Sequence, residues 1–233
     1  MERIDKILSS ALKISRTDVK KLMKKQCVTV GGNRITDSNA KFDPDSDDIR
    51  LNGKAINYKR HIYIMMNKPQ GVISASEDKS VPTVVDLVPD ELKRPGLFPA
   101  GRLDSDTTGF VLITDDGDFA HRILSPKNHV EKTYHARLER PLSDGDIKSF
   151  ADGIKLRDGT LCLESKLESL GGSMAQVIIH EGKYHQVKRM FAAVGNRVLE
   201  LKRVQIGGLR LDESLKSGEC REITQAELEK ITE

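Results

Sequence analysis

The sequence predicts an α+β protein of two domains. Short apolar segments typical of strands recur from residue 61 to residue 206 without regularly spaced crossover helices, which favours a mixed, mainly antiparallel sheet flanked by helices. Before them, residues 4–25 show the apolar spacing of two short helices. The polar stretch 52–60, which contains Gly53, is the predicted linker. We therefore expect one domain over residues 1–58 and a second over residues 59–233.

The composition indicates a soluble protein. Of its 233 residues 37% are hydrophobic and 31% charged, and no apolar run is long enough to span a bilayer. Charged residues follow Met1 at once, so we expect no secretory leader and a cytoplasmic location. Cys27, Cys162 and Cys220 are far apart and form no CxxC pair, which indicates neither a disulfide framework nor a zinc site. We expect a monomer that holds no metal and does not contact membranes.

Two amphipathic helices are predicted at the N-terminus. Ser15 is a typical N-cap for the second helix, and Asp18 three residues later is a carboxylate variant of the capping box. Short strands at 28–30 and 49–51 complete the domain. The apolar stripe of the first helix consists of Ile4, Ile7, Leu8, Ala11 and Leu12, and that of the second of Val19, Leu22 and Met23.

Positive charge is concentrated in this first domain. The whole chain has a net charge of +3, but residues 1–34 contain nine basic side chains against three acidic ones. Together with Arg3, one face of the second helix is a candidate RNA contact, because clustered cations attract phosphates. The alternative from charge alone is an ordinary solvated face. The residues of this face are Arg16, Lys20, Lys21, Lys24 and Lys25.

The second domain combines strands and helices in an irregular order. Strands are predicted at residues 61–66, 109–114, 133–139, 161–170, 175–180 and 197–206. Helices are predicted at residues 118–124, 143–151, 184–194 and 224–231, and a Thr224/Glu227 capping box opens the last. Pro69 should end the first strand and leave Lys68 at a loop, so we expect Lys68 to contact a phosphate or the active site.

The most informative segment is Gly101–Gly109, GRLDSDTTG, which leads into an apolar run over residues 110–113. Its two glycines allow a sharp turn and a close approach to a ligand, and the polar residues between them are suited to presenting side chains. Asp104 and Asp106 are both candidate catalytic carboxylates. The alternative is that they are ordinary turn residues.

Four segments of the second domain resemble, in the same order, the motifs of the pseudouridine synthase family. They are NKPQG at 67–71, GRLDSDTTGFVLITDDG at 101–117, EKTY at 131–134 and EGKYHQVKRMFAAVGN at 181–196. Their wording is most similar to the branch that modifies small-subunit ribosomal RNA. Residues 1–60 resemble the S4-like RNA-binding domain, also called the alpha-L motif, with Gly32 where asparagine is usual. The resemblance implies the fold of each domain.

The resemblance also assigns a catalytic set. It implies that Asp104, which follows the Arg-Leu pair, is the nucleophile and that Lys188 supplies the cation that keeps it ionised, with Arg189 as the alternative. Tyr134 would pack against the target base. Without the resemblance, Lys188 and Arg189 are an exposed helix face and Tyr134 is ordinary core.

Further RNA contacts follow from the same resemblance. Arg102 would take the place of a flipped base in the RNA stack, unless it pairs with Asp106 instead. Arg189 would contact RNA beside the active site.

These implications describe an RNA-modifying enzyme. Converting uridine into pseudouridine breaks the N-glycosidic bond, turns the base and rejoins it through carbon; without a redox change it needs no cofactor. The expected partner is small-subunit ribosomal RNA or a small-subunit assembly intermediate. Two alternatives are a non-catalytic assembly factor and a base-removing glycosidase. The glycosidase would need a second acid or base, for which Asp115, Asp116 and Asp118 are available.

Overall fold

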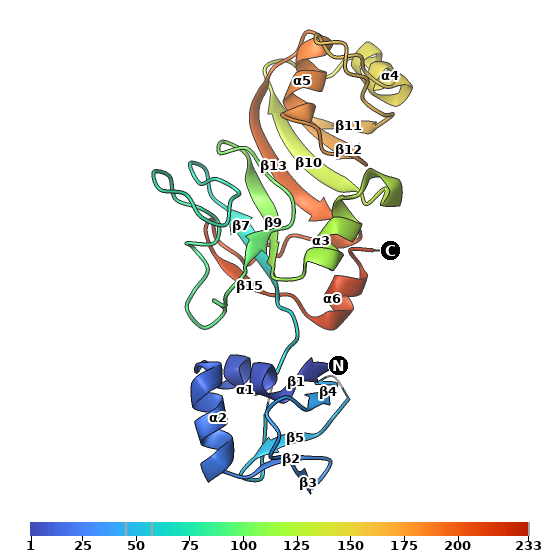
Figure 1. Cartoon of the computed structure of the whole chain (residues 1–233). Coiled ribbons are helices and arrows are strands. Elements are labelled where there is room, and N and C mark those ends of the chain that lie inside the picture. Colours follow the sequence, from blue (N-terminus) through green and yellow to red (C-terminus); the bar gives the residue numbers. More distant parts are fainter. Residues whose placement is uncertain (45, 57, 233) are drawn as a thin grey trace. The chain divides into compact units, whose positions relative to one another are not determined.

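The structure is a computed structural model that describes residues 1–44, 46–56 and 58–232. It divides into two compact units, Met1–His61 and Ile62–Glu233, and each is described by itself (Figure 1). The boundary predicted from the sequence, between residues 58 and 59, lies close to this division. No helix in the described part of the chain is both long and apolar enough to cross a membrane.

The two helices predicted for the N-terminal unit are confirmed. α1 spans Ile4–Leu12 and α2 spans Arg16–Lys25. Ser15 caps α2, because its Oγ accepts the N–H of Asp18 at 3.1 Å and donates to the Asp18 carboxylate at 2.6 Å. Five residues of the predicted stripes are buried and three, Ala11, Leu12 and Leu22, are half-buried. The buried ones share one core with residues of the neighbouring strands, and its members are Ile4, Ile7, Leu8, Val19, Met23, Val28, Val30 and Ile49.

A small antiparallel sheet in the order β3-β2-β5-β6 completes the N-terminal unit. β2 and β5 confirm the two strands predicted there. The short strands β1 (Glu2–Arg3) and β4 (Lys41–Phe42) pair with each other separately. The strands of the sheet are β2 (Val28–Val30), β3 (Asn33–Arg34), β5 (Ile49–Leu51) and β6 (Lys54–Ala55).

The predicted linker was wrong over its first residues. Asn52 and Gly53 have φ angles of 50° and 80° and form the turn of a hairpin in which Lys54 pairs with Leu51. Asn-Gly is the preferred sequence for such a two-residue turn, and the polarity of the stretch concealed that signal. β6 therefore extends the sheet. Asn57, also in the predicted linker, lies outside the described residues.

The C-terminal unit is built on a mixed, mainly antiparallel sheet, as predicted. Its main path is β11-β12-β10-β13-β9-β7-β15, with β8 on β9 and β14 on β13. Of the pairings described, only that between β9 and β13 is parallel. The strands are β7 (Tyr63–Lys68), β8 (Phe98–Pro99), β9 (Thr108–Thr114), β10 (Lys132–Leu138), β11 (Lys166–Gly171), β12 (Met174–Ile179), β13 (Val198–Ile206), β14 (Leu209–Arg210) and β15 (Cys220–Glu222).

Two strands differ from their predictions. The first was expected to end at residue 66, but β7 runs on through Lys68. Another was expected to begin at residue 161, but β11 begins at Lys166 and Leu161 makes only an isolated bridge to Lys155. Leu161 and Leu163 are exposed, so the apolar alternation that suggested a strand there does not mark a buried face.

Helices pack on both faces of this sheet, and all four were predicted. α3 (Gly117–Leu124) and α6 (Gln225–Glu229) contribute to one core, and α4 (Asp144–Asp152) and α5 (Gln186–Ala193) to the other (Figure 1). A short 3-10 helix, Pro126–Asn128, follows α3. Ser143 and Thr224 form complete capping boxes for α4 and α6.

The apolar run after the polar loop is buried on both faces of the sheet. Phe110 and Leu112 belong to the core with α3 and α6, whereas Val111 and Ile113 belong to the core with α4 and α5. A Cβ on Gly109, whose φ is 97°, would meet the Arg203 carbonyl oxygen on β13 at 2.2 Å. Glycine is therefore required there. The loop over residues 101–107 leads directly into β9, which lies between β13 and β7 within the sheet.

Candidate active site

The loop before β9 is held in place by backbone and side-chain contacts from the segment after β7. The Gly71 N–H donates to the Ser105 carbonyl at 2.8 Å. Ser74 Oγ accepts the N–H of Leu103 at 3.0 Å and donates to its carbonyl at 3.1 Å. Because these bonds fix the backbone on both sides of Asp104, the fold itself sets where that carboxylate lies.

Lys68 anchors the same loop. Of the two contacts expected for it, a phosphate or the active site, the buried side chain makes the second and is not accessible for the first. Its side chain is 0% exposed, and Nζ donates to the carbonyls of Pro69, Ser105 and Thr107 at 3.0, 3.2 and 2.9 Å. Burial lowers its pKa to about 8, against the opposing attraction of Asp106 and Asp104. Pro69 does follow the strand, but Lys68 still belongs to β7 and its side chain turns inward.

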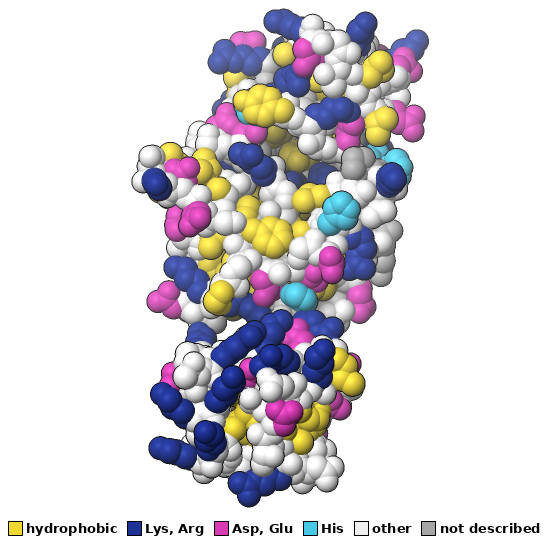
Figure 2. Space-filling view, in the orientation of Figure 1, with side chains coloured by type: hydrophobic (Ala, Val, Ile, Leu, Met, Phe, Trp, Pro, Cys, Tyr) yellow, Lys and Arg dark blue, Asp and Glu magenta, His cyan; other side chains and the backbone are white. Residues whose placement is uncertain are grey.

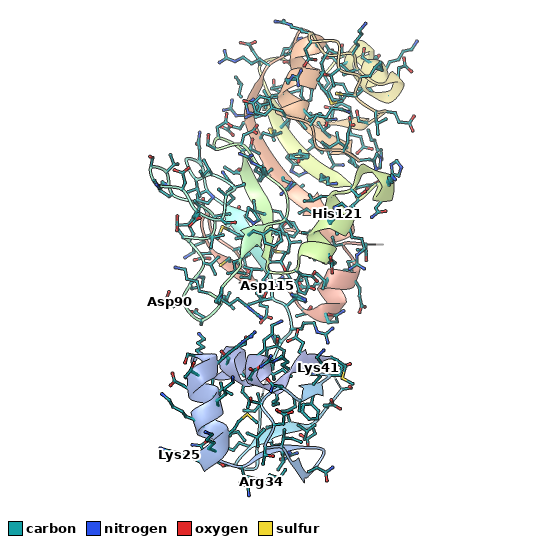
Figure 3. All side chains as sticks on the ribbon, in the orientation of Figure 1. Lys25, Arg34, Lys41, Asp90, Asp115 and His121 are labelled. Atoms are coloured by element: carbon teal, nitrogen blue, oxygen red, sulfur yellow. The ribbon has the colours of Figure 1, made fainter. Side chains whose placement is uncertain are left out.

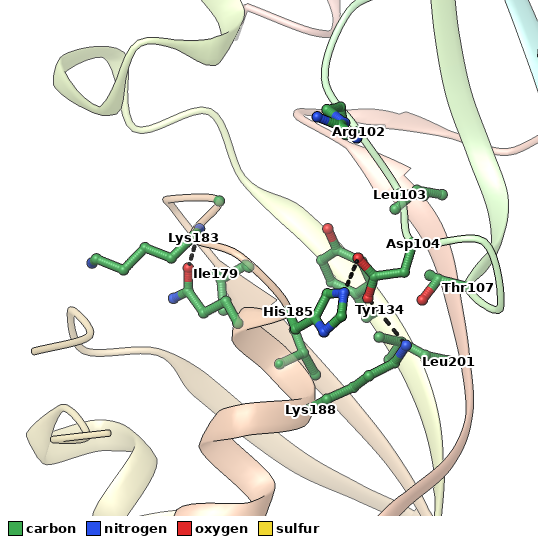
Figure 4. Close-up of a pocket in the computed structure, with 13 residues that line it drawn as sticks. Arg102, Leu103, Asp104, Thr107, Tyr134, Ile179, Lys183, His185, Lys188 and Leu201 are labelled. Carbon is green, nitrogen blue, oxygen red and sulfur yellow. Dashed lines mark hydrogen bonds and ion pairs between the residues drawn. The ribbon is translucent and has the colours of Figure 1, made fainter. Parts of the chain in front are cut away.

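A pocket opens beside this loop (Figure 4). Three of the four motifs found in the sequence meet there, because the loop, the strands and the start of α5 each form part of its wall. NKPQG supports the loop instead. Among the lining residues are Arg102, Asp104 and Thr107 from the loop, Tyr134, Ile179 and Leu201 from the strands, and Lys183, His185 and Lys188 from the α5 segment.

Asp104 is bound by two side chains from the α5 segment. Lys188 Nζ lies 3.0 Å from Asp104 Oδ2, and His185 Nε2 lies 3.3 Å from Asp104 Oδ1. The Asp104 side chain is 24% exposed, so it is accessible from the pocket yet partly shielded from water. The sequence left Lys188 and Arg189 open as partners of this carboxylate, and in the structure Lys188 is the partner.

Lys188 also bonds Asp106, with 2.5 Å between Nζ and Oδ1. That hydrogen bond lowers the pKa of Asp106 below its ordinary value, although partial burial opposes the shift. Burial works against the charge of Lys188, but its hydrogen bonds to Asp106 and Asp104 outweigh that effect and raise its pKa. One ammonium group therefore serves both carboxylates and stays charged at neutral pH.

Tyr134 lies in β10 behind Asp104, and its ring forms part of the pocket wall (Figure 4). The side chain is buried and belongs to the core with α4 and α5. It is thus both a core residue and a pocket residue. An aromatic wall beside a carboxylate can accept a planar ring.

The two arginines near the pocket differ in their surroundings. Arg102 is exposed at the pocket rim and has no partner among the described residues (Figure 4). Its suggested pairing with Asp106 is not found, since Asp106 bonds Lys188. Arg189 forms an ion pair with Asp158, and its NH1 donates to the Tyr184 carbonyl at 3.2 Å. Arg189 therefore ties α5 to the segment between α4 and β11.

Two pocket residues escaped the sequence analysis. His185 contacts Asp104, and its position three residues before Lys188 was the available signal. Thr107 is 1% exposed, and its Oγ1 has no partner among the described residues. Its place in the loop was visible, but the inward direction of its hydroxyl was not.

The N-terminal unit carries the predicted basic face. Lysines and arginines gather on one side of this unit, over α2 (Figure 2), and Lys25 projects from the end of that helix (Figure 3). Arg16, Lys20, Lys21, Lys24 and Lys25 are all exposed. Arg3 differs, because it forms a two-pronged ion pair with Asp5 at 3.1 and 2.6 Å.

A model of the RNA pseudouridylate synthase family matches residues 62–193, and a model of the S4 domain matches residues 2–49. The chain belongs to the pseudouridine synthase family. It is 43% identical over 231 residues to the ribosomal small subunit pseudouridine synthase A of Yersinia pestis, covering 98% of this chain and 97% of that protein.

Other pseudouridine synthases are similar over the whole chain. An uncharacterized RNA pseudouridine synthase of Bacillus subtilis is 44% identical over 235 residues, covering 99% of this chain and 98% of that protein. A crystal structure of a pseudouridylate synthase shares 39% identity with a TM-score of 0.70, and covers 99% of this chain and 100% of that one. The α+β fold and the enzyme class expected from the sequence are thereby confirmed.

Metal binding finds no support in the side chains around the pocket. Across residues 1–44, 46–56 and 58–232, no three His, Cys, Asp or Glu side chains are grouped so that they could hold an ion. The chemistry that the pocket offers is that of a carboxylate, its cation and an aromatic wall.

Proposed function

We propose that this pseudouridine synthase isomerises a uridine of small-subunit ribosomal RNA, with Asp104 as its catalytic residue and the target base flipped out of the RNA. The observation that carries the proposal is the position of Asp104, which opens into the pocket while Lys188 and His185 bind its two oxygens. The substrate class is supported by the name of the Yersinia pestis relative and by the match to an S4 domain.

The conversion of uridine into pseudouridine requires a carboxylate at the reacting nucleotide. The bond between N1 of uracil and C1′ of ribose breaks, a bond between C5 and C1′ forms, C5 loses a proton and N1 gains one. Nothing is oxidised or reduced, so no cofactor is required. Asp104 can form a covalent adduct or stabilise positive charge at the sugar, as carboxylates do in glycosidases. Lys188 Nζ, 3.0 Å from Oδ2, and His185 Nε2, 3.3 Å from Oδ1, position this carboxylate for either role.

Tyr134 and Arg102 act at two places during base flipping: Tyr134 at the flipped base and Arg102 at the gap that the base leaves in the RNA. The Tyr134 ring in the pocket wall can pack against the uracil while it is detached from the sugar and turns. Arg102, exposed at the rim, can fill the gap that the base leaves in the RNA. Two groups that differ in exposure thereby serve the same step.

The N-terminal domain, residues 1–58, serves as the RNA-docking part of a monomeric, cytoplasmic enzyme. The five exposed cations of α2 contact phosphates, raise the local concentration of the catalytic domain on the RNA and set its register. Because phosphate contacts carry little sequence information, RNA shape and the pocket choose the uridine.

The base-removing alternative is disfavoured by the carboxylates that it would require. Asp115 binds the Ile62 N–H and the Arg94 guanidinium, and Asp116 caps α3. Both follow β9, whereas Asp104 precedes it, and seven residues of strand span roughly 20 Å. They are therefore structural residues at the other end of the strand.

The experiment that tests the function maps pseudouridine in small-subunit ribosomal RNA after incubation with the wild type, Asp104→Asn or Asp106→Asn. We expect the wild type to convert one uridine, Asp104→Asn to convert none while still binding RNA, and Asp106→Asn to retain measurable activity. Asp90→Asn is the surface control. Full activity of Asp104→Asn, or conversion by the wild type of large-subunit RNA alone, would overturn the proposal.

A further inference from the structure

An aromatic side chain lies exposed beside the pocket and has no part in the function proposed above. Tyr184 is 76% exposed and is the one exposed aromatic residue in the described part of the chain. The other three tyrosines, Tyr58, Tyr63 and Tyr134, are buried or half-buried. A ring of this size, exposed next to residues that line the pocket, can bind a ligand.

The Tyr184 ring is held in a fixed orientation. It stacks on the His185 imidazole with 3.8 Å between ring centroids and 18° between planes. His185 in turn contacts Asp104 at 3.3 Å, and Arg189 NH1 bonds the Tyr184 carbonyl. An aromatic ring whose position is set before binding offers a flat surface at little entropic cost.

The backbone at this position is strained in a way that supports a functional role. His185 has φ 49° and ψ 34°, the left-handed conformation that costs a non-glycine residue about 1 kcal/mol or more. His185 is the N-cap residue of α5 and lines the pocket, and the Tyr184 ring stacks on its imidazole. Such strain persists where the surrounding structure enforces it, and it clusters at ligand sites.

We infer that Tyr184 binds a second nucleobase of the substrate RNA, the base of a nucleotide next to the target uridine. This inference rests on the proposed function. One face of the ring is covered by His185, so the other face is the one that a base can use. The target uridine itself enters the pocket beside Tyr134, which leaves Tyr184 for a neighbour.

The first test compares Tyr184→Leu and Tyr184→Phe with the wild type on a small-subunit ribosomal RNA transcript. Loss of base stacking should raise KM roughly tenfold in Tyr184→Leu while kcat changes much less, and Tyr184→Phe should stay close to the wild type because its ring is retained. Leu170→Ala removes another exposed apolar side chain, on β11, and should leave KM unchanged. Circular dichroism checks that each variant is folded.

The second test identifies the base. Abasic nucleotides are placed one at a time at the two positions on either side of the target uridine, and RNA affinity is measured in an Asp104→Asn background. At one position the abasic change should lower the RNA affinity of the protein that retains Tyr184 roughly tenfold. It should hardly change the affinity of the Tyr184→Leu protein, since the same contact is already lost there.

The outcomes separate this inference from the proposed function. If the loss of RNA affinity from the abasic change and the loss from Tyr184→Leu add at every position, or if Tyr184→Leu leaves KM unchanged, the stacking site is overturned. Conversion of uridine by the wild type would not be affected by either result. A wild type that converts no uridine of small-subunit RNA overturns the proposed function, and the inference falls with it. Equal loss in Tyr184→Phe and Tyr184→Leu also overturns it, because the phenylalanine ring can still stack.

Discussion

The two units of the molecule use positive charge in different ways. In the N-terminal unit, Lys20 and Lys24 of α2 are exposed to solvent. In the C-terminal unit, Lys68 is fully buried and Lys188 is 24% exposed, and each is bound to oxygen atoms of one loop. The first kind of cation is free to meet a polyanion, whereas the second kind organises the protein itself.

The difference teaches what each kind of cation can be expected to do. Exposed charges act over about 10 Å and are screened by salt, so each contributes little and a neighbour can replace it. A buried cation acts through fixed contacts and is hardly screened, so its loss leaves particular oxygens without a partner. Substitutions in the two units should therefore differ in both size and salt dependence.

The largest effect should come from Lys188→Met. Without the ammonium group, Asp104 keeps only its contact with His185, and Asp106 loses the hydrogen bond from Lys188. We expect kcat for pseudouridine formation to fall by about 100-fold to 1,000-fold, with Lys188→Arg recovering part of the activity. The loss should be the same at low and high salt; a defect that salt suppresses would place Lys188 with the exposed cations.

Lys68→Met should act mainly on stability. The substitution leaves the carbonyls of Pro69, Ser105 and Thr107 without their donor, although it also removes a buried charge. We expect the free energy of unfolding in urea to fall by about 2–3 kcal/mol. Hydrogen exchange in residues 101–107 should become faster. An unchanged stability would mean that Gly71 and Ser74 hold the loop without help.

Lys68 also marks where sequence reasoning ended. Helical stripes, N-caps and the polar loop depend on neighbours in the chain, so α1, α2 and α6 were predicted closely. The direction in which Lys68 points depends on a loop 37 residues away, which no local pattern reveals. Lys132 and Arg203 are likewise buried, and no local pattern shows where their side chains point.

The catalytic cluster shows the same division. Asp104 and Lys188 came from a resemblance between motifs, because 84 residues separate them and spacing alone could not pair them. His185 was missed because the contact between its imidazole and Asp104 joins distant parts of the chain, and only its place three residues before Lys188 pointed to it. The hairpin at Asn52 was a local signal that was overlooked, so that error was avoidable.

A smaller effect is expected from Lys20→Gln with Lys24→Gln. Two phosphate contacts fewer should weaken binding to small-subunit ribosomal RNA by about tenfold at moderate salt and reduce the salt slope by about 1.5. Filter binding over a salt series measures both. Lys41→Gln with Lys54→Gln, also exposed but outside α2, is the matched control (Figure 3). Equal losses in both pairs would show that only the total charge of the unit matters.

The smallest effect concerns Lys132, a buried cation outside the active site. Its Nζ donates to the Val130 carbonyl at 2.6 Å, and burial, with some repulsion from Arg203, lowers its pKa to about 8. In the unfolded chain the pKa is close to 10.4, so between these values the unfolded state binds more protons and stability rises with pH. From pH 7 to pH 9 the free energy of unfolding of the wild type should rise by about 1 kcal/mol relative to that of Lys132→Met.

Urea unfolding of both proteins measures this difference, with Lys148→Met on the exposed face of α4 as the control. A constant difference in stability across this pH range would mean that Lys132 keeps its proton when the protein is folded. Burial would then not lower the pKa of this lysine, and the same expectation for Lys68 would be in doubt.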